Sequence, residues 1–268
     1  MKHNYHTHTF RCHHAGGTER EYIEKAIERS LETLGFSDHC PYSFPNGYVS
    51  GFRMEPDKTE GYYRTLGELR EEYEGKLEIP IGFEVEYYPE LFDSLLDHLY
   101  QSAVTLPSGQ VVRAQYIIMG QHFTHNEYDI RAYSGGLTGD EHVLADYVES
   151  VLKGLETGRF TYVAHPDIVN YQGPDAIYEK HMLEICRYAK AHEIPLEINL
   201  LGLNTGRNYP NPLFWELVRE TGNTVVLGCD AHQVDQVANP AHIAAGLEFA
   251  RLAGVEVTDG VKLRNPFG

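Results

Sequence analysis

Residues 3–39 read HNYHTHTFRCHHAGGTEREYIEKAIERSLETLGFSDH, the pattern of a strand, a helix and a second strand. The run HNYHTH at 3–8 is interpreted as the first strand. Thr18 and Glu21 then form a capping box, and apolar residues recur at helical spacing until Gly35 closes the pattern. The run LGFSD at 34–38 is the second strand candidate. This stretch therefore predicts one βα unit and the start of the next.

The same alternation continues along the chain. Five more strand candidates lie at 79–85, 115–120, 160–164, 194–200 and 223–228. Helical patterns begin near Asp57, Pro89, Asp140, Asp175, Pro212 and Pro240, with Asn211 and Asn239 as N-caps before proline. No linker interrupts this order, which favours a single α/β domain over 1–268 with the strands in a closed or nearly closed barrel of about seven βα units. The long stretches 40–57 and 122–140 are predicted to be active-site loops.

Composition excludes several classes of protein. Hydrophobic residues make up 42% and charged residues 23% of the 268 residues, as in ordinary globular proteins. The net charge of −17 disfavours binding to nucleic acid or anionic membranes. No apolar run approaches the roughly 18 residues of a membrane span, and the first residues lack a secretory signal, so a cytoplasmic location is expected. The four cysteines form no CxxC pair, which favours reduced thiols.

Histidines and carboxylates gather where the predicted strands end. Six of the seven strand ends carry such residues: His6, His8, His39, Glu84, His122, His165, Asp230 and His232. The remaining strand ends with Asn199. A lone histidine in such a place is usually structural, but this joint placement predicts a site for several metal ions, because barrel enzymes build their sites at these ends. Histidine with carboxylate suits zinc, manganese or iron better than calcium.

Seven motifs carry a resemblance to a known family. They are HTHT at 6–9, SDHCPY at 37–42, GFEVEY at 82–87, GQHF at 120–123, AHPD at 164–167, EINLLGLN at 197–204 and GCDAH at 228–232. In this order and spacing they resemble the polymerase and histidinol phosphatase (PHP) family along the whole chain. The resemblance implies a distorted (β/α)7 barrel of the TIM-like type. Within the family the chain is most similar to stand-alone histidinol phosphate phosphatases, which implies hydrolysis of L-histidinol phosphate in histidine biosynthesis.

The resemblance also implies a set of ligands for two to three divalent metal ions. The first would be held by His6, His8, Glu84 and Asp230, the second by Glu84, His122 and His165, and the third by His14, His39 and His232. Glu84 would bridge two ions, and His13 could take the place of its neighbour His14. Glu84, Asp230 and His232 are the expected catalytic residues.

A phosphomonoester fits the chemistry of such a centre. Several divalent ions lower the pKa of a bridging water, which supplies hydroxide, and they neutralise phosphate oxygens. Arg207 is the first candidate for contacting the phosphate, because a guanidinium matches two phosphate oxygens, with Arg131 and Arg53 as weaker candidates and Asn199 as a further polar contact. Asp167, His125 and a metal-bound water all stay open as the acid for the leaving group.

Other functions are consistent with parts of this pattern. The alternatives are a PHP-family phosphoesterase acting on another small phosphomonoester or on nucleotides, an amidohydrolase-type deaminase and a non-catalytic metal-binding protein. A deaminase of that type commonly carries a lysine on the fourth strand, where this chain reads AQYIIMG. All nine expected ligand positions hold competent ligand types, which disfavours the non-catalytic alternative. The pattern does not choose among the metals and carries no signal about a homo-oligomer.

Overall fold

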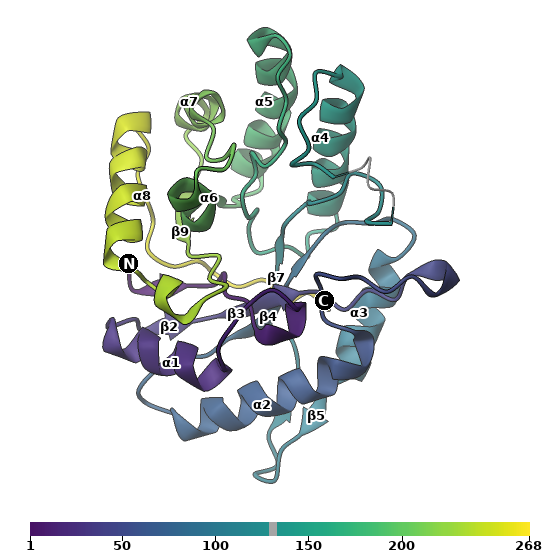
Figure 1. The fold of residues 1–268 in the computed structure, drawn as a ribbon, viewed down its shortest axis with the longest axis vertical. Helices are drawn as coiled ribbons and strands as arrows, with labels where there is room; N and C mark the ends of the chain where they lie inside the picture. Colours follow the sequence, from purple (N-terminus) through teal and green to yellow (C-terminus); the bar gives the residue numbers. More distant parts are fainter. Residues whose placement is uncertain (129–132) are drawn as a thin grey trace.

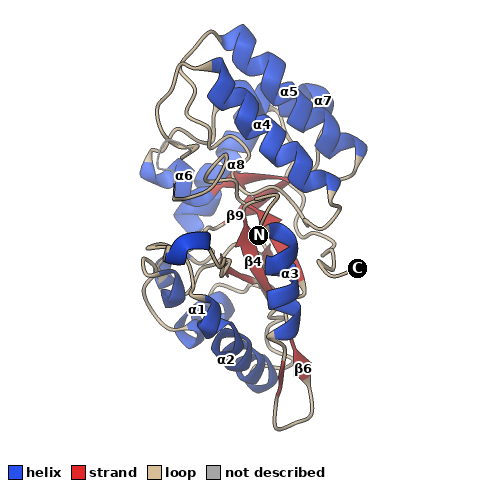
Figure 2. Cartoon of the chain, turned by 90° about the vertical axis from the view of Figure 1, so that its right-hand side faces the viewer, coloured by secondary structure: helices blue, strands red, loops and turns tan. Residues whose placement is uncertain are grey.

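The computed structural model describes residues 1–128 and 133–268, with strands lying between two groups of helices (Figures 1 and 2). The strands are β1 His3–Asn4, β2 Thr33–Leu34, β3 Phe36–His39, β4 Ile81–Val85, β5 Val104–Thr105, β6 Val111–Val112, β7 Tyr116–Met119, β8 Leu196–Asn199 and β9 Val225–Gly228. The helices are α1 Glu19–Glu28, α2 Thr59–Glu72, α3 Phe92–Gln101, α4 Glu141–Glu156, α5 Asp175–Ala191, α6 Leu200–Thr205, α7 Pro212–Thr221 and α8 Pro240–Ala253. Helices α4, α5 and α7 lie on one side of the strands, and α1 and α2 lie on the other.

Local capping sets the helix starts that the sequence predicted. The capping box of α1 is present, with the Thr18 side chain accepting from the Glu21 amide and the Glu21 carboxylate accepting from the Thr18 amide. Asn211 and Asn239 cap α7 and α8, each followed by proline at the first helical position. These side chains satisfy amides that a helix N-terminus leaves without an intrahelical partner, which explains why the starts were predictable.

The end of α1 differs from the prediction. The apolar pattern predicted a helix as far as Gly35, but α1 ends at Glu28. Ser30 takes a left-handed conformation with φ 59°, and Thr33–Leu34 then pairs with β1 as a parallel strand. Leu31 and Leu34 are buried after the end of the helix, so their apolar character reflects packing of the β2 segment as well as helical periodicity.

Parallel pairing runs through most of the strand segments. Strands β3, β4 and β7 form one sheet, and β8 pairs with β9. The predicted fifth strand at 160–164 is reduced to bridges from Val163 to Met119 and to Leu196. Thr7 bridges Ala231, and its carbonyl accepts from the Ser37 amide at 2.8 Å. The segments that the sequence predicted are therefore neighbours, although several are shorter than expected.

Two short elements were missing from the sequence prediction. Strands β5 and β6 form an antiparallel hairpin between α3 and β7. Helix α6 directly follows β8 and is capped by the Asn199 side chain, which accepts from the Gly202 amide. Both elements are too short to give a clear periodic signal. The placement of α6 matters for the site, because it fixes the orientation of the Asn199 amide.

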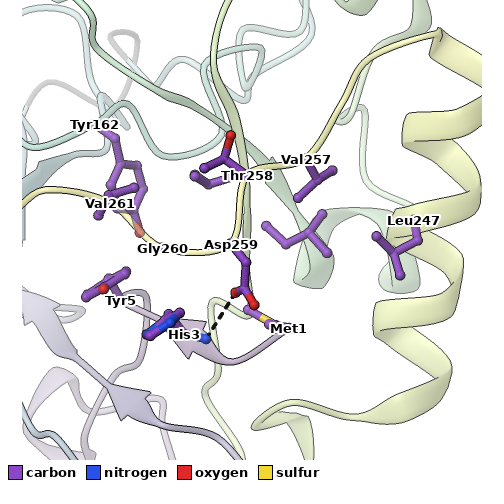
Figure 3. A pocket seen from close by; sticks show the side chains of 12 residues that line it. Met1, His3, Tyr5, Tyr162, Leu247, Val257, Thr258, Asp259, Gly260 and Val261 are labelled. Carbon is purple, nitrogen blue, oxygen red and sulfur yellow. Dashed lines mark hydrogen bonds between the residues drawn. The ribbon is translucent and has the colours of Figure 1, made fainter.

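The C-terminal segment covers the starts of several strands. Val257 bridges Val225, and the Asp259 carboxylate accepts from the amides of Lys2 and His3. A cavity of about 190 Å³ remains there, and Figure 3 shows Tyr5, Tyr162, Leu247 and Val261 among its lining side chains. In the described ranges, every helix falls short of the length and hydrophobicity that a bilayer span requires.

Candidate metal centre

The ends of the first and last predicted strands lie side by side. Thr7 forms a parallel bridge with Ala231, and the His8 amide donates to the Ala231 carbonyl at 3.0 Å. Alternate side chains of an extended chain share a face, which places His6 and His8 together. The bridge sets His232 and Asp230, whose backbone is left-handed with φ 48°, beside them. The pairing brings together four predicted ligands: His6, His8, Asp230 and His232.

Four side chains surround a first space for a cation. Asp230 Oδ1 lies 3.1 Å from His8 Nε2 and 3.5 Å from His6 Nε2. Glu84 Oε2 lies 3.5 Å from His8 Nε2 and 3.6 Å from His6 Nε2. Ligands of a tetrahedral ion with bonds of about 2.1 Å are about 3.4 Å apart, so these separations match such an ion.

Glu84 reaches a second group through its other oxygen. Oε1 accepts a hydrogen bond from His165 Nε2 at 2.8 Å and lies 3.7 Å from His122 Nε2. Glu84 is only 1% exposed, and a Cβ on Gly120 would overlap its carboxylate. The two oxygens of one carboxylate thus face two histidine groups, the arrangement that a bridging ligand requires.

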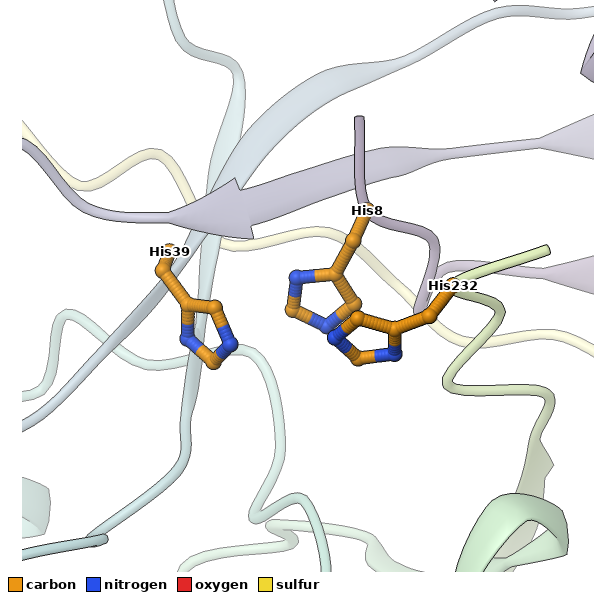
Figure 4. Close-up of side chains that lie close together, drawn as sticks. All are labelled: His8, His39 and His232. Carbon is orange, nitrogen blue, oxygen red and sulfur yellow. The ribbon is translucent and has the colours of Figure 1, made fainter. Parts of the chain in front are cut away.

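A third group of rings lies at the mouth of the site. The ring centroids of His14 and His232 are 4.6 Å apart, and those of His14 and His39 are 5.3 Å apart. Figure 4 shows His8, His39 and His232 converging from three separate segments. His13 takes a left-handed conformation and its Nε2 lies 3.5 Å from Glu55, so His14 is the residue that joins this group.

Many nitrogen and oxygen atoms of these groups that could bind a metal have no hydrogen-bond partner within the described chain. All are buried: His6 Nε2, His8 Nδ1 and Nε2, His39 Nδ1, Glu84 Oε2, His165 Nδ1, Asp230 Oδ1 and His232 Nε2. Leaving a buried polar atom unpaired costs about 1–3 kcal/mol. So many unpaired atoms in one place fit a site that divalent cations complete, and the mixture of imidazole and carboxylate suits zinc, manganese or iron.

The charges in this cluster shift several pKa values. Burial opposes protonation of His6, but Glu197, Asp230 and Glu84 raise its pKa well above the usual value. Burial also opposes protonation of His8, yet the neighbouring carboxylates of Asp230 and Asp38 raise its pKa to about 9. Burial and the neighbouring His8 lower the pKa of His232 to about 3. Without a metal, protons on His6 and His8 balance the carboxylates.

Metal affinity is therefore expected to rise with pH. A cation must displace the proton on His8, whose pKa is about 9, so each displaced proton adds about tenfold to the apparent association constant per pH unit below that pKa. Competitive chelator titrations with Zn²⁺ between about pH 6 and 9 measure this slope, and proton release in weak buffer checks it. An affinity that stays constant over this range would contradict the prediction.

Further carboxylates lie at the Nδ1 atoms of two histidines, on the side of each ring away from the cation space. The His122 Nδ1–H donates to Glu86 Oε1 at 2.8 Å, and His8 Nδ1 lies 3.5 Å from Asp38. Such partners select the tautomer and aim the other ring nitrogen at the metal. Neither role was predicted from the sequence, although Glu86 stands two residues after Glu84 and Asp38 stands next to His39 in the quoted motifs.

The predicted substrate contacts lie in different environments. Arg207 lines the same cavity as His39, His122 and His232, and it donates to the Tyr209 hydroxyl at 2.7 Å. Asn199 is 1% exposed and donates to Glu197 and Asp230, so its amide faces the cluster of predicted ligands. Arg131 lies outside the described residues.

Three other candidates from the sequence lie away from this cavity. Arg53 is 1% exposed and pairs with Glu86 and Glu127, which keeps its guanidinium from a bound phosphate. Asp167 is buried and accepts from the Trp215 indole at 3.0 Å. His125 lies 3.4 Å from Asp146 and lines a separate cavity. Asp167 and His125 therefore do not reach the space between the ligands.

The α/β fold and the cluster of histidines and carboxylates at its strand ends define a protein that binds several divalent metal ions. The sequence profile of the PHP domain matches residues 4–200, and the chain belongs to this family.

Two curated relatives are similar over most of their length. One from Deinococcus radiodurans, named "Probable histidinol-phosphatase", is 27% identical over 245 residues, which cover 87% of this chain and 86% of the relative. The Histidinol-phosphatase of Bacillus subtilis is 24% identical and is covered to 96%. The crystal structure of histidinol phosphate phosphatase from Lactococcus lactis subsp. lactis, complexed with zinc, L-histidinol and phosphate, shares the fold. The two structures superpose with a TM-score of 0.69 at 18% sequence identity, over 99% of this chain and 97% of the Lactococcus lactis chain.

Proposed function

We propose that this protein is a metal-dependent phosphomonoesterase that hydrolyses L-histidinol phosphate to L-histidinol and phosphate. The observation that carries the proposal is the convergence of unpartnered, buried histidine and carboxylate atoms beside a cavity that Arg207 also lines. The choice of L-histidinol phosphate as the substrate rests on the curated relatives, which are named histidinol-phosphatase.

We further propose that the chain forms one domain whose strands close into a distorted (β/α)7 barrel. Hydrogen bonds and bridges run from Thr7 to β3, and through β4 and β7 to Val163. They continue through β8 and β9 to Ala231, which returns to Thr7. This circuit supports closure with seven segments, and it explains why ligands from both ends of the chain share one site.

The ligand roles follow the three groups of side chains. His6, His8, Glu84 and Asp230 would hold one ion, Glu84, His122 and His165 a second, and His14, His39 and His232 a third. Divalent ions bound there supply a nucleophilic water near neutral pH and neutralise charge on the phosphate. Glu84 holds the first and second groups of ligands at a fixed separation. Arg207 binds phosphate oxygens at the rim of the cavity.

The rest of the cavity suits an aromatic substrate. It has a volume of about 440 Å³, and Phe52, Phe123 and Tyr133 form part of its lining. The Phe52 and Phe123 ring centroids are 5.7 Å apart, and those of Phe123 and Tyr133 are 5.4 Å apart. Aromatic faces favour stacked or edge-on contact with another ring, which is consistent with the imidazole of histidinol.

A substrate panel tests this function. Phosphate release is measured for metal-reconstituted protein with L-histidinol phosphate, several other small phosphomonoesters, nucleotides and a nuclease substrate. We expect kcat/KM for L-histidinol phosphate to exceed the others by about 100-fold or more, because the cavity must bind the leaving group as well as the phosphate. Similar kcat/KM values for all the small phosphomonoesters would support a phosphoesterase but reject L-histidinol phosphate as its specific substrate.

The role of Arg207 makes a separate prediction. Arg207→Gln removes a charged donor that is worth about 1.5–3 kcal/mol, so kcat/KM is expected to fall by about 10- to 100-fold, mostly through KM. Steady-state kinetics measure the effect. Arg187→Gln, which changes an exposed arginine on α5, is the matched control. Equal KM values for the two variants would reject the phosphate contact.

A further inference from the structure

Glu197 lies behind the first group of ligands. It is 0% exposed on β8, and its Oε2 accepts a hydrogen bond from His6 Nδ1–H at 2.9 Å, while Oε1 lies 3.1 Å from the same nitrogen. A carboxylate can only accept here, so Nδ1 carries a proton, and Nε2 is the nitrogen that can offer a lone pair to a cation. That nitrogen faces Glu84 and Asp230 and has no hydrogen-bond partner.

Asn199 links Glu197 to a second ligand. Its Oδ1 accepts from the Gly202 amide at 2.8 Å at the start of α6, which fixes the orientation of the side-chain amide. Nδ2 then donates to Glu197 Oε1 at 2.8 Å and to Asp230 Oδ2 at 3.1 Å. One oxygen of Asp230 is thereby occupied, and the other faces the two histidines.

A glycine lies beside the carboxylate of Glu197, as another does beside that of Glu84. Glu84 pairs in register with Ile118, and a Cβ on Gly120, two residues further, would overlap its carboxylate. Glu197 pairs with Val226, and a Cβ on Gly228, again two residues further, would overlap its carboxylate. Both carboxylates therefore occupy space beside a glycine, where any other residue would place a side chain.

We propose that Glu197 and Asn199 are positioning residues that fix the tautomer of His6 and the free oxygen of Asp230 for the first metal ion. The inference deepens the proposed function, since it rests on the ligand groups assigned there. Partners of this kind raise the basicity of a metal-binding imidazole and restrict its orientation, and their loss typically weakens metal affinity by about 10- to 100-fold.

A purely structural role for Glu197 would have different consequences. Removing a buried hydrogen bond lowers the stability of the fold whether or not a metal is bound. A positioning role additionally changes how tightly and with what geometry the metal is held. Metal affinity and the spectrum of a bound ion therefore distinguish the two roles, and neither depends on the identity of the substrate.

The test compares Glu197→Gln with Glu184→Gln, a control at an exposed glutamate of α5. Zn²⁺ affinity is measured by competition with a chelator, and the visible spectrum is recorded after loading with Co²⁺. For Glu197→Gln we expect Zn²⁺ affinity to fall by about 10- to 100-fold and the Co²⁺ bands to shift, with kcat reduced more than KM changes. Glu184→Gln is expected to match the unmodified protein in each measurement.

Folded Glu197→Gln protein with unchanged Zn²⁺ affinity and an unchanged Co²⁺ spectrum would overturn the proposal. If this variant does not fold, NMR of the unmodified Zn²⁺-loaded protein decides the question. A slowly exchanging proton on His6 Nδ1 with the metal on Nε2 is expected, and a metal on Nδ1 would overturn the inference. A flat substrate panel with these results would reject the proposed substrate and leave the positioning roles intact.

Discussion

Glu84→Ala is expected to lower kcat/KM by at least about 10³-fold while the protein stays folded. The loss corresponds to several kcal/mol of transition-state stabilisation, the scale that metal ions supply in hydrolysis. Glu84 Oε1 contacts His165 at 2.8 Å, and Oε2 lies 3.1 Å from His39 and close to the first group. Glu84 thus presents one oxygen to each of the two histidine groups.

The measurement combines kinetics, metal content and thermal unfolding of Glu84→Ala. Its control is Glu74→Ala, which removes an exposed glutamate beyond the end of α2. We expect metal content to fall in Glu84→Ala only, because alanine leaves the surrounding histidines without their shared carboxylate. The folded state is expected to persist, since the carboxylate buries little apolar area. Normal turnover by this variant would reject the bridging role.

Arg53→Met is expected to lower the free energy of unfolding by about 3–5 kcal/mol, because it removes the guanidinium that two buried carboxylates share. Arg53 Nη1 lies 3.0 Å from Glu86 Oε2, and its Nε donates to Glu127 Oε2 at 2.6 Å. The guanidinium also lies 4.5 Å from the Phe52 ring centroid. This one side chain thus connects the 40–57 loop to Glu86, directly after β4, and to Glu127 in the 122–140 loop.

Urea and thermal denaturation measure the effect of Arg53→Met, with Arg187→Met as an exposed control. A loss of this size lowers Tm by about 10 °C in a domain of this length. Adding Glu127→Gln to Arg53→Met is expected to restore part of the stability, because one uncompensated charge is then removed. A Tm for Arg53→Met equal to that of the control would contradict the prediction.

The loss of stability in Arg53→Met is also expected to depend on pH, with a definite sign. With Arg53 present, burial raises the pKa of Glu127 while the guanidinium lowers it. In Arg53→Met the lowering contribution is lost, so the folded-state pKa rises further above that of the unfolded chain. The destabilisation should therefore be largest at neutral pH and diminish as acid protonates Glu127 in the folded state.

Local sequence signals were sufficient for most of the secondary structure. The capping box of Thr18 and Glu21 and the Asn-Pro starts of α7 and α8 act within one turn, so the residues themselves set these boundaries. The predicted helix to Gly35 was wrong because apolar residues that pack as β2 imitate helical spacing. The fifth strand was predicted as a run and is reduced to bridges at Val163, since its length depends on both neighbours.

The sequence by itself determined the α/β class, the placement of histidines and carboxylates at strand ends, and the type of metal that such donors suit. These properties depend on residue identity and on periodicity along the chain. Tertiary structure alone decided that Glu197 fixes His6 across 191 positions, that Asn199 faces Asp230, and that Arg53 is buried between carboxylates. The reason is that hydrogen-bond partners and desolvation depend on which distant strands become neighbours, and no local pattern in the sequence specifies that pairing.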